Sequence, residues 1–445
     1  MCCFVRKLTG KDYVLGVQHM FAMFGATVLV PLLTGLNVST TLLMAGLGTL
    51  LFHILTKGKV PAFLGSSFAF LGGYSAVAPL LENGAPNTEM LPYASLGVVF
   101  AGLLYLVLAF LFKIFDVKKV MKFFPPVVTG PIIISIGLIL APSAISNCQS
   151  NWFVAFVAFA TIVVCNIMGK GMIKIIPILI GIAVSCALSV VLQLCGVEMF
   201  EPAKLQAFHD AAWIGLPIHM EQSVFAVRDS AAAVSAIIAI MPISIAAMME
   251  HIGDISAISS TIGKNLIADP GLHRTLMGDG LATSLSAIFG GPANTTYGEN
   301  TGVLALTKVY DPRVIRIAAY LAVILSFSPK VAALISLIPT AVIGGISLIL
   351  YGMISAIGTR NLVENRVDLS KSRNIIVTAT ILVCALGFNS VGGLTFTVFG
   401  TPITLTGLAI AAILGIALNA LLPGKDFEFT ADDSESSETG VDFKL

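Results

Sequence analysis

Long apolar runs separated by short polar connections make up nearly the whole chain. Because a helix needs roughly 17 to 25 apolar residues to cross a bilayer, this pattern predicts fourteen membrane-spanning segments. They lie near residues 13–33, 40–56, 61–81, 92–112, 124–143, 151–169, 172–195, 231–262, 275–291, 294–310, 312–328, 333–357, 374–391 and 401–422. We therefore expect an all-α polytopic membrane protein.

Two of these segments, the third and the tenth, break the apolar pattern. Residues 64–70 read LGSSFAF, and residues 289–308 read FGGPANTTYGENTGVLALTK. In the second stretch, Gly290 to Pro292 ends the preceding helix, and Glu299 opens a new apolar one. Unpaired backbone groups are costly in lipid, so irregular backbone persists only inside protein or beside a cavity. Each segment is expected to be a short extended stretch followed by a half-helix, and to form part of a site.

The distribution of basic residues among the loops predicts how the spans are oriented in the membrane. Charged residues make up only 11% of the chain, and its mean hydropathy is +0.94. When the loops alternate from a cytoplasmic N-terminus, only Lys204, Arg228 and Lys330 of the 25 Lys and Arg residues lie outside. The positive-inside rule therefore favours an even number of spans with both termini cytoplasmic.

A long external segment divides the spans into two sets of seven. The resulting parts are the N-terminus at 1–12, a first repeat at 13–195, the external connection at 196–230, a second repeat at 231–422 and an acidic cytoplasmic tail at 423–445.

The two sets of spans resemble each other in two ways. The third span of each is interrupted, and the fifth opens with proline followed by glycine, at Pro125 and Gly130 and again at Pro339 and Gly344. Because seven is odd, the sets have opposite orientations, which predicts a seven-plus-seven inverted repeat. The two interrupted segments are then expected to meet near the membrane midplane.

Carboxylates within the spans are candidates for chemistry, because an ionised one at the bilayer centre costs at least roughly 2.5 to 3.5 kcal/mol. Glu299 begins a half-helix; the alternative is that it only stabilises the helix dipole. Glu250 and Asp254, which flank His251, share one helical face. Two like charges so close favour retention of a proton, although this face could also be an exposed cytoplasmic helix end.

Other polar or aromatic residues are weaker candidates. His19, after Gln18, could relay protons or bond a neighbouring helix. Phe68 could cover a flat ligand or simply pack, and Asp279 and Lys330 carry less weight.

Several other functions find no support. The six histidines are dispersed, and the sequence contains no HExxH and no GxxxxGK[ST] motif. No metal, cofactor or enzymatic reaction is therefore expected. Protons are the expected coupling ion. A net charge of +1, without a basic stretch rich in aromatics, indicates no nucleic-acid partner. Secondary transport remains.

Five stretches resemble the nucleobase-ascorbate transporter family, and within it the bacterial uracil-transporting branch. They are QHMFAMFGATVLVP (18–31), PAFLGSSFAF (61–70), EHIGD (250–254), DPGLHR (269–274) and NTTYGENTGVLALTK (294–308). The resemblance implies fourteen spans divided into a core domain and a gate domain, and a homodimer formed through the gate domain. It also implies proton-coupled uptake of a nucleobase, with uracil favoured, across the bacterial cytoplasmic membrane.

The same resemblance assigns roles to residues. Glu250 and Glu299 match the carboxylates that hydrogen-bond the base, while Phe68 and Gly298 border it. Carboxylates suit the N–H donors of uracil, and backbone N–H groups suit its carbonyls. The residues assigned to proton coupling are Asp254, His251 and Glu250, and the supporting residues are Gln18, His19, Tyr297, Asn300 and Gly344.

One position departs from the uracil branch. That branch resembles EHxGH in the eighth span, whereas this chain ends the motif with Asp254, as the purine branch does. A xanthine or purine permease therefore stays open as an alternative, and so does an anion transporter with the same fold.

Overall fold

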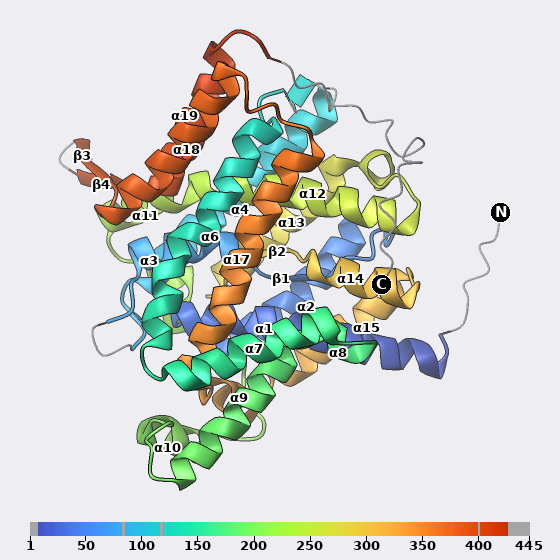
Figure 1. Cartoon of the computed structure of the whole chain (residues 1–445), viewed down its shortest axis with the longest axis vertical. Helices are drawn as coiled ribbons and strands as arrows, with labels where there is room; N and C mark the ends of the chain where they lie inside the picture. The colour runs from blue at the N-terminus through green and yellow to red at the C-terminus, as the bar shows by residue number, and fades with distance from the viewer. Residues whose placement is uncertain (1–7, 82–84, 116–118, 121, 399–400, 426–445) are drawn as a thin grey trace.

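The computed structural model describes residues 8–81, 85–115, 119–120, 122–398 and 401–425, most of which are helical (Figure 1). The first half contains α1 (Gly10–Thr34), α2 (Val38–Leu55), β1 (Leu64–Ser66), η1 (Phe68–Phe70), α3 (Leu71–Val77), α4 (Leu91–Ile114), α6 (Pro126–Cys148), α7 (Trp152–Met168), α8 (Met172–Ile175), α9 (Pro177–Leu194) and α10 (Pro202–Asp210).

The second half contains the remaining elements. It contains η2 (Met220–Gln222), η3 (Val224–Ala226), α11 (Ser230–Ile240), η4 (Met241–Ile243), α12 (Ser244–Ile262), η5 (Ile267–Gly271), α13 (Leu272–Ile288), β2 (Asn294–Thr296), α14 (Glu299–Thr307), α15 (Pro312–Ser326), α16 (Pro329–Ser336), α17 (Thr340–Glu364), α18 (Ser372–Ser390), β3 (Leu394–Val398), β4 (Thr401–Leu405) and α19 (Gly407–Leu421).

Each of the fourteen predicted segments overlaps at least one helix. By length and composition, eight helices of the described residues can cross a membrane, or nine if the pair α15 and α16, bent by 90°, counts as one span. Shorter apolar helices occupy 68–77, 152–168 and 407–421. The protein is therefore a multi-span helical protein, and the count of fourteen stays a prediction.

Two predicted boundaries were wrong. The segment 333–357 is not one helix, because α16 ends at Ser336 and α17 begins after Pro339. Proline cannot continue a preceding helix. The segment 401–422 begins as strand β4, which pairs antiparallel with β3. Strand β3 alternates threonine with apolar residues, and β4 is also rich in both, which suits strands. The all-α expectation therefore misses this hairpin.

Helices α6 and α17 lie side by side through close glycine contacts (Figure 1). An added Cβ on Gly137 would lie 2.2 Å from the carbonyl oxygen of Tyr351, and one on Gly344 would lie 2.6 Å from the amide nitrogen of Cys148. Small residues allow helix backbones to approach in this way. Helices α7, α9, α18 and α19 pack around this pair.

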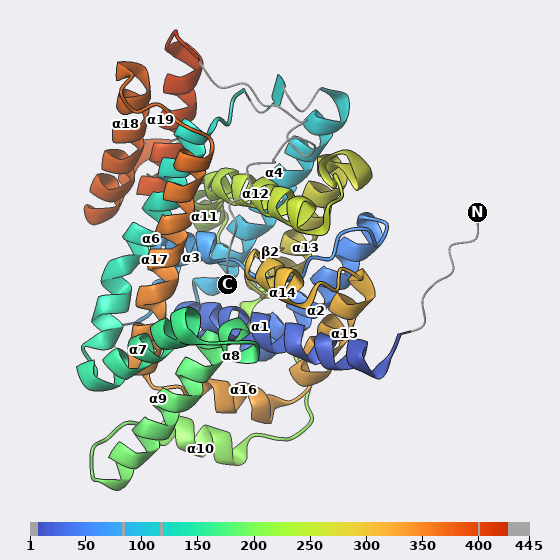
Figure 2. The ribbon, with the colours of Figure 1, turned by 45° about the vertical axis from the view of Figure 1, so that its right-hand side comes forward.

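A second group of helices packs beside the first, and Figure 2 shows α1, α2, α13 and α15 together around β2. Within it, α13 is bonded to α4, since the Ser284 hydroxyl donates to the carbonyl oxygen of Val99 at 3.0 Å. Helix α15 packs on both α1 and α2. This second group encloses the two interrupted segments.

Candidate functional site

The two interrupted segments meet, as predicted, in a short antiparallel ladder. β1 pairs with β2 in the register Leu64 with Thr296, Gly65 with Thr295 and Ser66 with Asn294. Backbone bonds from Ser67 to Ala293 (2.9 Å) and from Tyr297 to Phe63 (3.0 Å) extend it. Residues of both strands are buried. The ladder thus satisfies backbone groups that would be costly to leave unpaired in lipid.

Helix α1 and Tyr297 hold one side of the ladder. The Tyr297 hydroxyl donates to the carbonyl oxygen of Ser66 at 2.8 Å, and the Ser66 hydroxyl donates to the carbonyl oxygen of Thr27 at 2.9 Å. The Thr27 hydroxyl lies 3.4 Å from that of Tyr297. Tyr297, expected as a supporting residue, therefore ties the two strands to α1.

Helices α2 and α13 hold the other side. The Thr49 hydroxyl accepts the Leu64 amide at 2.9 Å. The Asn294 side-chain amide donates to the carbonyl oxygen of Met44 at 2.7 Å, and the Thr283 hydroxyl donates to the carbonyl oxygen of Asn294 at 2.9 Å. Polar side chains from two helices thereby fix the position of both strands.

A half-helix follows each strand. After β1 the chain turns through η1, where Phe68 is half-buried, into α3; after β2 it passes the half-buried Gly298 into α14. The first N–H groups of a helix lack partners within the helix and attract polar or anionic groups. The structure describes α14 as beginning at Glu299, but the side chains of Glu299 and Asn300 lie outside its described part.

Helix α12 brings its acidic face to the start of α14. A Cβ added to Gly298 would lie 2.7 Å from Oδ1 of Asp254, so this carboxylate touches the backbone where α14 begins. Glu250 lies one turn earlier on α12, and both acids are half-buried. The Asp254 carboxylate therefore faces the interior of the protein, and is not part of a solvent-exposed helix end.

His251 belongs to a separate buried cluster. Its Nδ1 lies 3.1 Å from the Thr296 hydroxyl and 3.3 Å from Oδ2 of Asp279, and the side chains of His251 and Asp279 are 0% exposed. Oδ1 of Asp279 accepts both the amide and the hydroxyl of Thr296, each at 2.9 Å. Because Thr296 donates its hydroxyl proton to Asp279, Nδ1 of His251 is the donor to that hydroxyl.

Asp279 is therefore better connected to the ladder than its sequence position suggests. It anchors β2 from α13, whereas sequence reasoning gave it little weight. The available signal was an acid between two glycines, Gly278 and Gly280, in a stretch with several serines and threonines. Tyr105 of α4, also missed, is fully buried next to Asp279, since a Cβ on Gly280 would lie 2.5 Å from Cβ of Tyr105.

Other expected residues lie on α1, α16 and α17. Gln18 and His19 are buried in α1, and neither ring nitrogen of His19 has a hydrogen-bond partner in the described chain. Gly344 lies in the contact of α17 with the end of α6. Lys330 donates to the carbonyl oxygen of Phe208 at 2.7 Å and secures the connection around α10. The described residues contain no group of three side chains suited to a metal ion.

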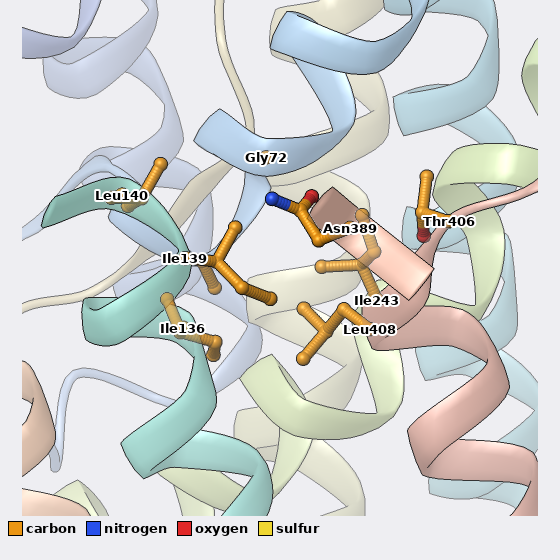
Figure 3. Close-up of a pocket in the computed structure, with 9 residues that line it drawn as sticks. Gly72, Ile136, Ile139, Leu140, Ile243, Asn389, Thr406 and Leu408 are labelled. Atoms are coloured by element: carbon orange, nitrogen blue, oxygen red, sulfur yellow. The ribbon is translucent and has the colours of Figure 1, made fainter. Parts of the chain in front are cut away.

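A small pocket lies next to η1, between the two groups of helices (Figure 3). It is mostly apolar, with two polar side chains, Asn389 at the end of α18 and Thr406 before α19. The other lining residues are Ala69, Gly72, Ile136, Ile139, Leu140, Ile243 and Leu408.

Comparison with known proteins finds one family. The model described as "Permease family", named for xanthine and uracil, matches residues 10–394. The chain is 40% identical to a uracil permease of Bacillus caldolyticus and 39% identical to one of Bacillus subtilis, in each case over 94% of both chains. It is 40% identical to a putative pyrimidine permease of Escherichia coli, over 93% of this chain and 89% of the relative.

Solved structures share the fold at low sequence identity. The transmembrane domain of the cyanobacterial bicarbonate transporter BicA has a TM-score of 0.56 at 15% identity and covers 92% of this chain and 97% of its own. Murine Slc26a9, an anion transporter in the inward-facing state, has a TM-score of 0.63 at 12% identity, over 94% of this chain and 69% of its own. At these identities the likeness concerns the fold alone.

Proposed function

This chain belongs to the permease family, and from that membership we propose that it takes up uracil across the membrane, coupled to protons, by alternating access. The substrate is proposed from the relatives of this chain, which are named uracil permeases and are about 40% identical over most of both chains. The position of the site is proposed from the β1–β2 ladder, which places two half-helix starts beside α12.

The base binds between these elements. Uracil has N–H donors and carbonyl acceptors around a flat neutral ring, so it needs acceptors, donors and a flat surface. Glu250 and Glu299 supply carboxylate acceptors, and backbone N–H groups near Gly298 donate a hydrogen bond to a carbonyl of the base. The ring of Phe68 covers one face. The half-buried positions of Phe68, Glu250 and Gly298 support this arrangement.

Proton coupling belongs to Asp254, His251 and Glu250. A protonated carboxyl group donates a hydrogen bond where a carboxylate accepts one. Protonation of a carboxylate on α12 therefore replaces an acceptor with a donor beside the start of α14. The contact of Asp254 with Gly298 supports this role. His251 is bonded into the Asp279–Thr296 cluster, so its protonation acts on the position of β2.

The two groups of helices correspond to the core and gate domains of a fourteen-span, seven-plus-seven inverted repeat. We assign α1 to α4 and α11 to α15 to the core, and α6 to α9 and α17 to α19 to the gate. The small pocket between the groups, lined by Asn389 and Thr406, supports a domain boundary there (Figure 3). We further propose a homodimer formed through the gate domain, in the lipid of a bacterial inner membrane, with both termini cytoplasmic.

Two alternatives each have one observation in favour. Asp254 favours a xanthine or purine permease, since the purine branch resembles this motif. The titles of the fold relatives name bicarbonate and anion transport, but fold alone does not decide substrate. Carboxylates of Glu250 and Asp254 at the site would repel an anion, which leaves a neutral base as the better fit.

Uptake of labelled uracil into a permease-deficient bacterium tests the proposal. The expressed protein should accumulate uracil, a protonophore should abolish accumulation, and unlabelled uracil should compete better than xanthine or bicarbonate. Stronger competition by xanthine would favour the purine alternative. Accumulation that survives the protonophore would exclude proton coupling.

A further inference from the structure

Five basic residues gather where α2, α4, α13 and α15 end or begin on the same face, and we call them the basic cluster: Lys57, Lys113, His273, Arg274 and Arg316. Arg274 donates to the carbonyl oxygen of Leu55 at 3.1 Å, which places it at the end of α2. A guanidinium nitrogen of Arg316 lies 2.6 Å from where a Cβ on Gly58 would be. Burial lowers the pKa of His273, and the positive charges of Arg274, Lys113 and Lys57 lower it further.

The basic cluster carries positive charge that the described residues do not neutralise. Arg316 lies 3.4 Å from Nδ1 of His53, and no ion pair to a carboxylate within the described ranges involves Lys57, Lys113, Arg274 or Arg316. The nearby Asp269 is already paired with Lys59, which lowers its pKa by hydrogen bonding. A cluster of positive charge of this kind attracts anionic groups.

The chain contains a segment with the complementary charge. Residues 426–445 carry seven acidic residues and one lysine, whereas the described loops around the cluster are basic. This tail follows α19, whose end lies by α18: a Cβ on Gly424 would lie 3.8 Å from Cδ of Arg373. In the proposed topology, α2 and α19 are the second and fourteenth spans, so both end at the cytoplasmic face.

The tail is long enough to reach the basic cluster. Twenty extended residues span up to about 70 Å, and a folded chain of this size has a radius of gyration of about 22 Å. The tail starts from the helix group of α18 and α19, and the basic cluster belongs to the group around β1 and β2. The chain continues from Lys57 through residues 58–63 to β1.

We propose that the acidic tail, residues 426–445, docks on the basic cluster and ties the two groups of helices together, which slows transport. The proposal rests on the cytoplasmic position of both parts and adds a regulatory interaction to the proposed transport function. The competing occupant is an anionic lipid headgroup, which also seeks basic residues at the membrane surface.

Photo-cross-linking in the full-length protein tests where the tail lies. A photoreactive phenylalanine analogue at Phe429 or Phe443, activated in native membranes, should form adducts mapped by mass spectrometry to peptides containing Lys57, Lys113 or Arg274. Salt should suppress the adducts, because the Debye length falls from about 10 Å at 0.1 M to about 3 Å at 1 M. Adducts confined to lipid or to other peptides would overturn the proposal.

Charge variants supply the matched comparison. Lys57 and Lys113 are exposed and make no side-chain hydrogen bond in the part of the chain that the structure describes, so Lys57→Gln with Lys113→Gln should fold normally. Adduct yield should then fall about fivefold, as expected for two exposed ion pairs. Lys170→Gln with Lys174→Gln, near α8, is the control and should leave the yield unchanged. Equal yields in both pairs would contradict docking on the cluster.

Transport provides the functional readout. Neutralising the tail at Asp432, Asp433 and Glu435 with the matching amides should raise the initial uptake rate about twofold or more. An unchanged rate despite lost cross-linking would overturn the regulatory part. Failure of the proposed transport function is a different result, since uracil uptake would then be absent in the parent while cross-linking persisted.

Discussion

Replacing Asp279 by asparagine perturbs the point where α12, α13 and β2 meet. Oδ1 of Asp279 accepts two hydrogen bonds from Thr296 at 2.9 Å each, and Oδ2 lies 3.3 Å from Nδ1 of His251. Asparagine preserves the shape and can keep an oxygen toward Thr296. Its NH₂ group then faces Nδ1 of His251, which is itself a donor in this network.

The cost follows from these contacts. Hydrogen bonds to a charged group contribute about 1.5 to 3 kcal/mol, and a buried donor left without an acceptor costs about 1 to 3 kcal/mol. The Asp279→Asn variant should therefore lose at least about 2 kcal/mol, or about 30-fold in the equilibrium that keeps β2 bonded. Because β2 leads into the proposed site, uracil affinity should fall together with stability.

Two measurements on detergent-purified protein check this expectation: the temperature at which the protein loses its folded elution profile, and the dissociation constant of uracil. Asp269→Asn is the control, because this acid is exposed in its pair with Lys59 and should change neither value appreciably. Thr296→Ser, which retains the hydroxyl, should stay close to the parent. If Asp279→Asn matched the parent in both measurements, the cluster would not support the ladder.

Three shorter predictions concern binding, packing and topology. Glu299→Gln should weaken uracil binding roughly tenfold to a hundredfold at normal expression, as measured by equilibrium binding; unchanged binding would mean that Glu299 only caps α14. Gly137→Ala should destabilise the protein by about 1 to 3 kcal/mol, because its Cβ would lie 2.2 Å from a backbone oxygen, whereas Gly352→Ala on the facing helix has open space and should not. In a cysteine-free background, an impermeant reagent should label a cysteine near Gln206 but not one near Lys371, and the reverse pattern would refute the topology.

The sequence was sufficient to predict the two broken spans, because irregular backbone at membrane depth persists only inside protein or beside a cavity. Their meeting was predicted from the opposite orientations of the two sets of seven spans. The LGSSFAF and ANTTYGEN stretches supply the two strands of one ladder. Hydrophobicity could not predict the register of that ladder. The register depends on Tyr297, Thr49 and Asn294, whose hydrogen-bond partners belong to other elements of the fold.

The missed features share a physical cause. In the β3–β4 hairpin, the apolar residues of β4 merged with those of α19 into the predicted span 401–422, and the short alternating strand β3 lay outside every predicted span. Asp279 was ranked low because spacing along a single helix shows nothing of Thr296 and His251, which come from other elements. Glu250 and Asp254 were predicted as a pair from their four-residue spacing, a relation that lies within one helix.

The coupling role of Asp254 can be separated from substrate binding. Uracil is neutral and gains nothing from membrane voltage by itself, so accumulation must come from the coupled proton, which contributes about 2.3 kcal/mol per 100 mV plus any pH gradient. Asp254→Asn keeps the shape that touches Gly298, but its amide no longer binds and releases a proton. The variant should therefore still bind uracil and exchange it between the two sides of a vesicle, yet fail to concentrate it against a gradient. If it accumulated labelled uracil as steeply as the parent under the same imposed pH difference, Asp254 would not be the coupling residue, and Glu250 or His251 would have to carry the proton.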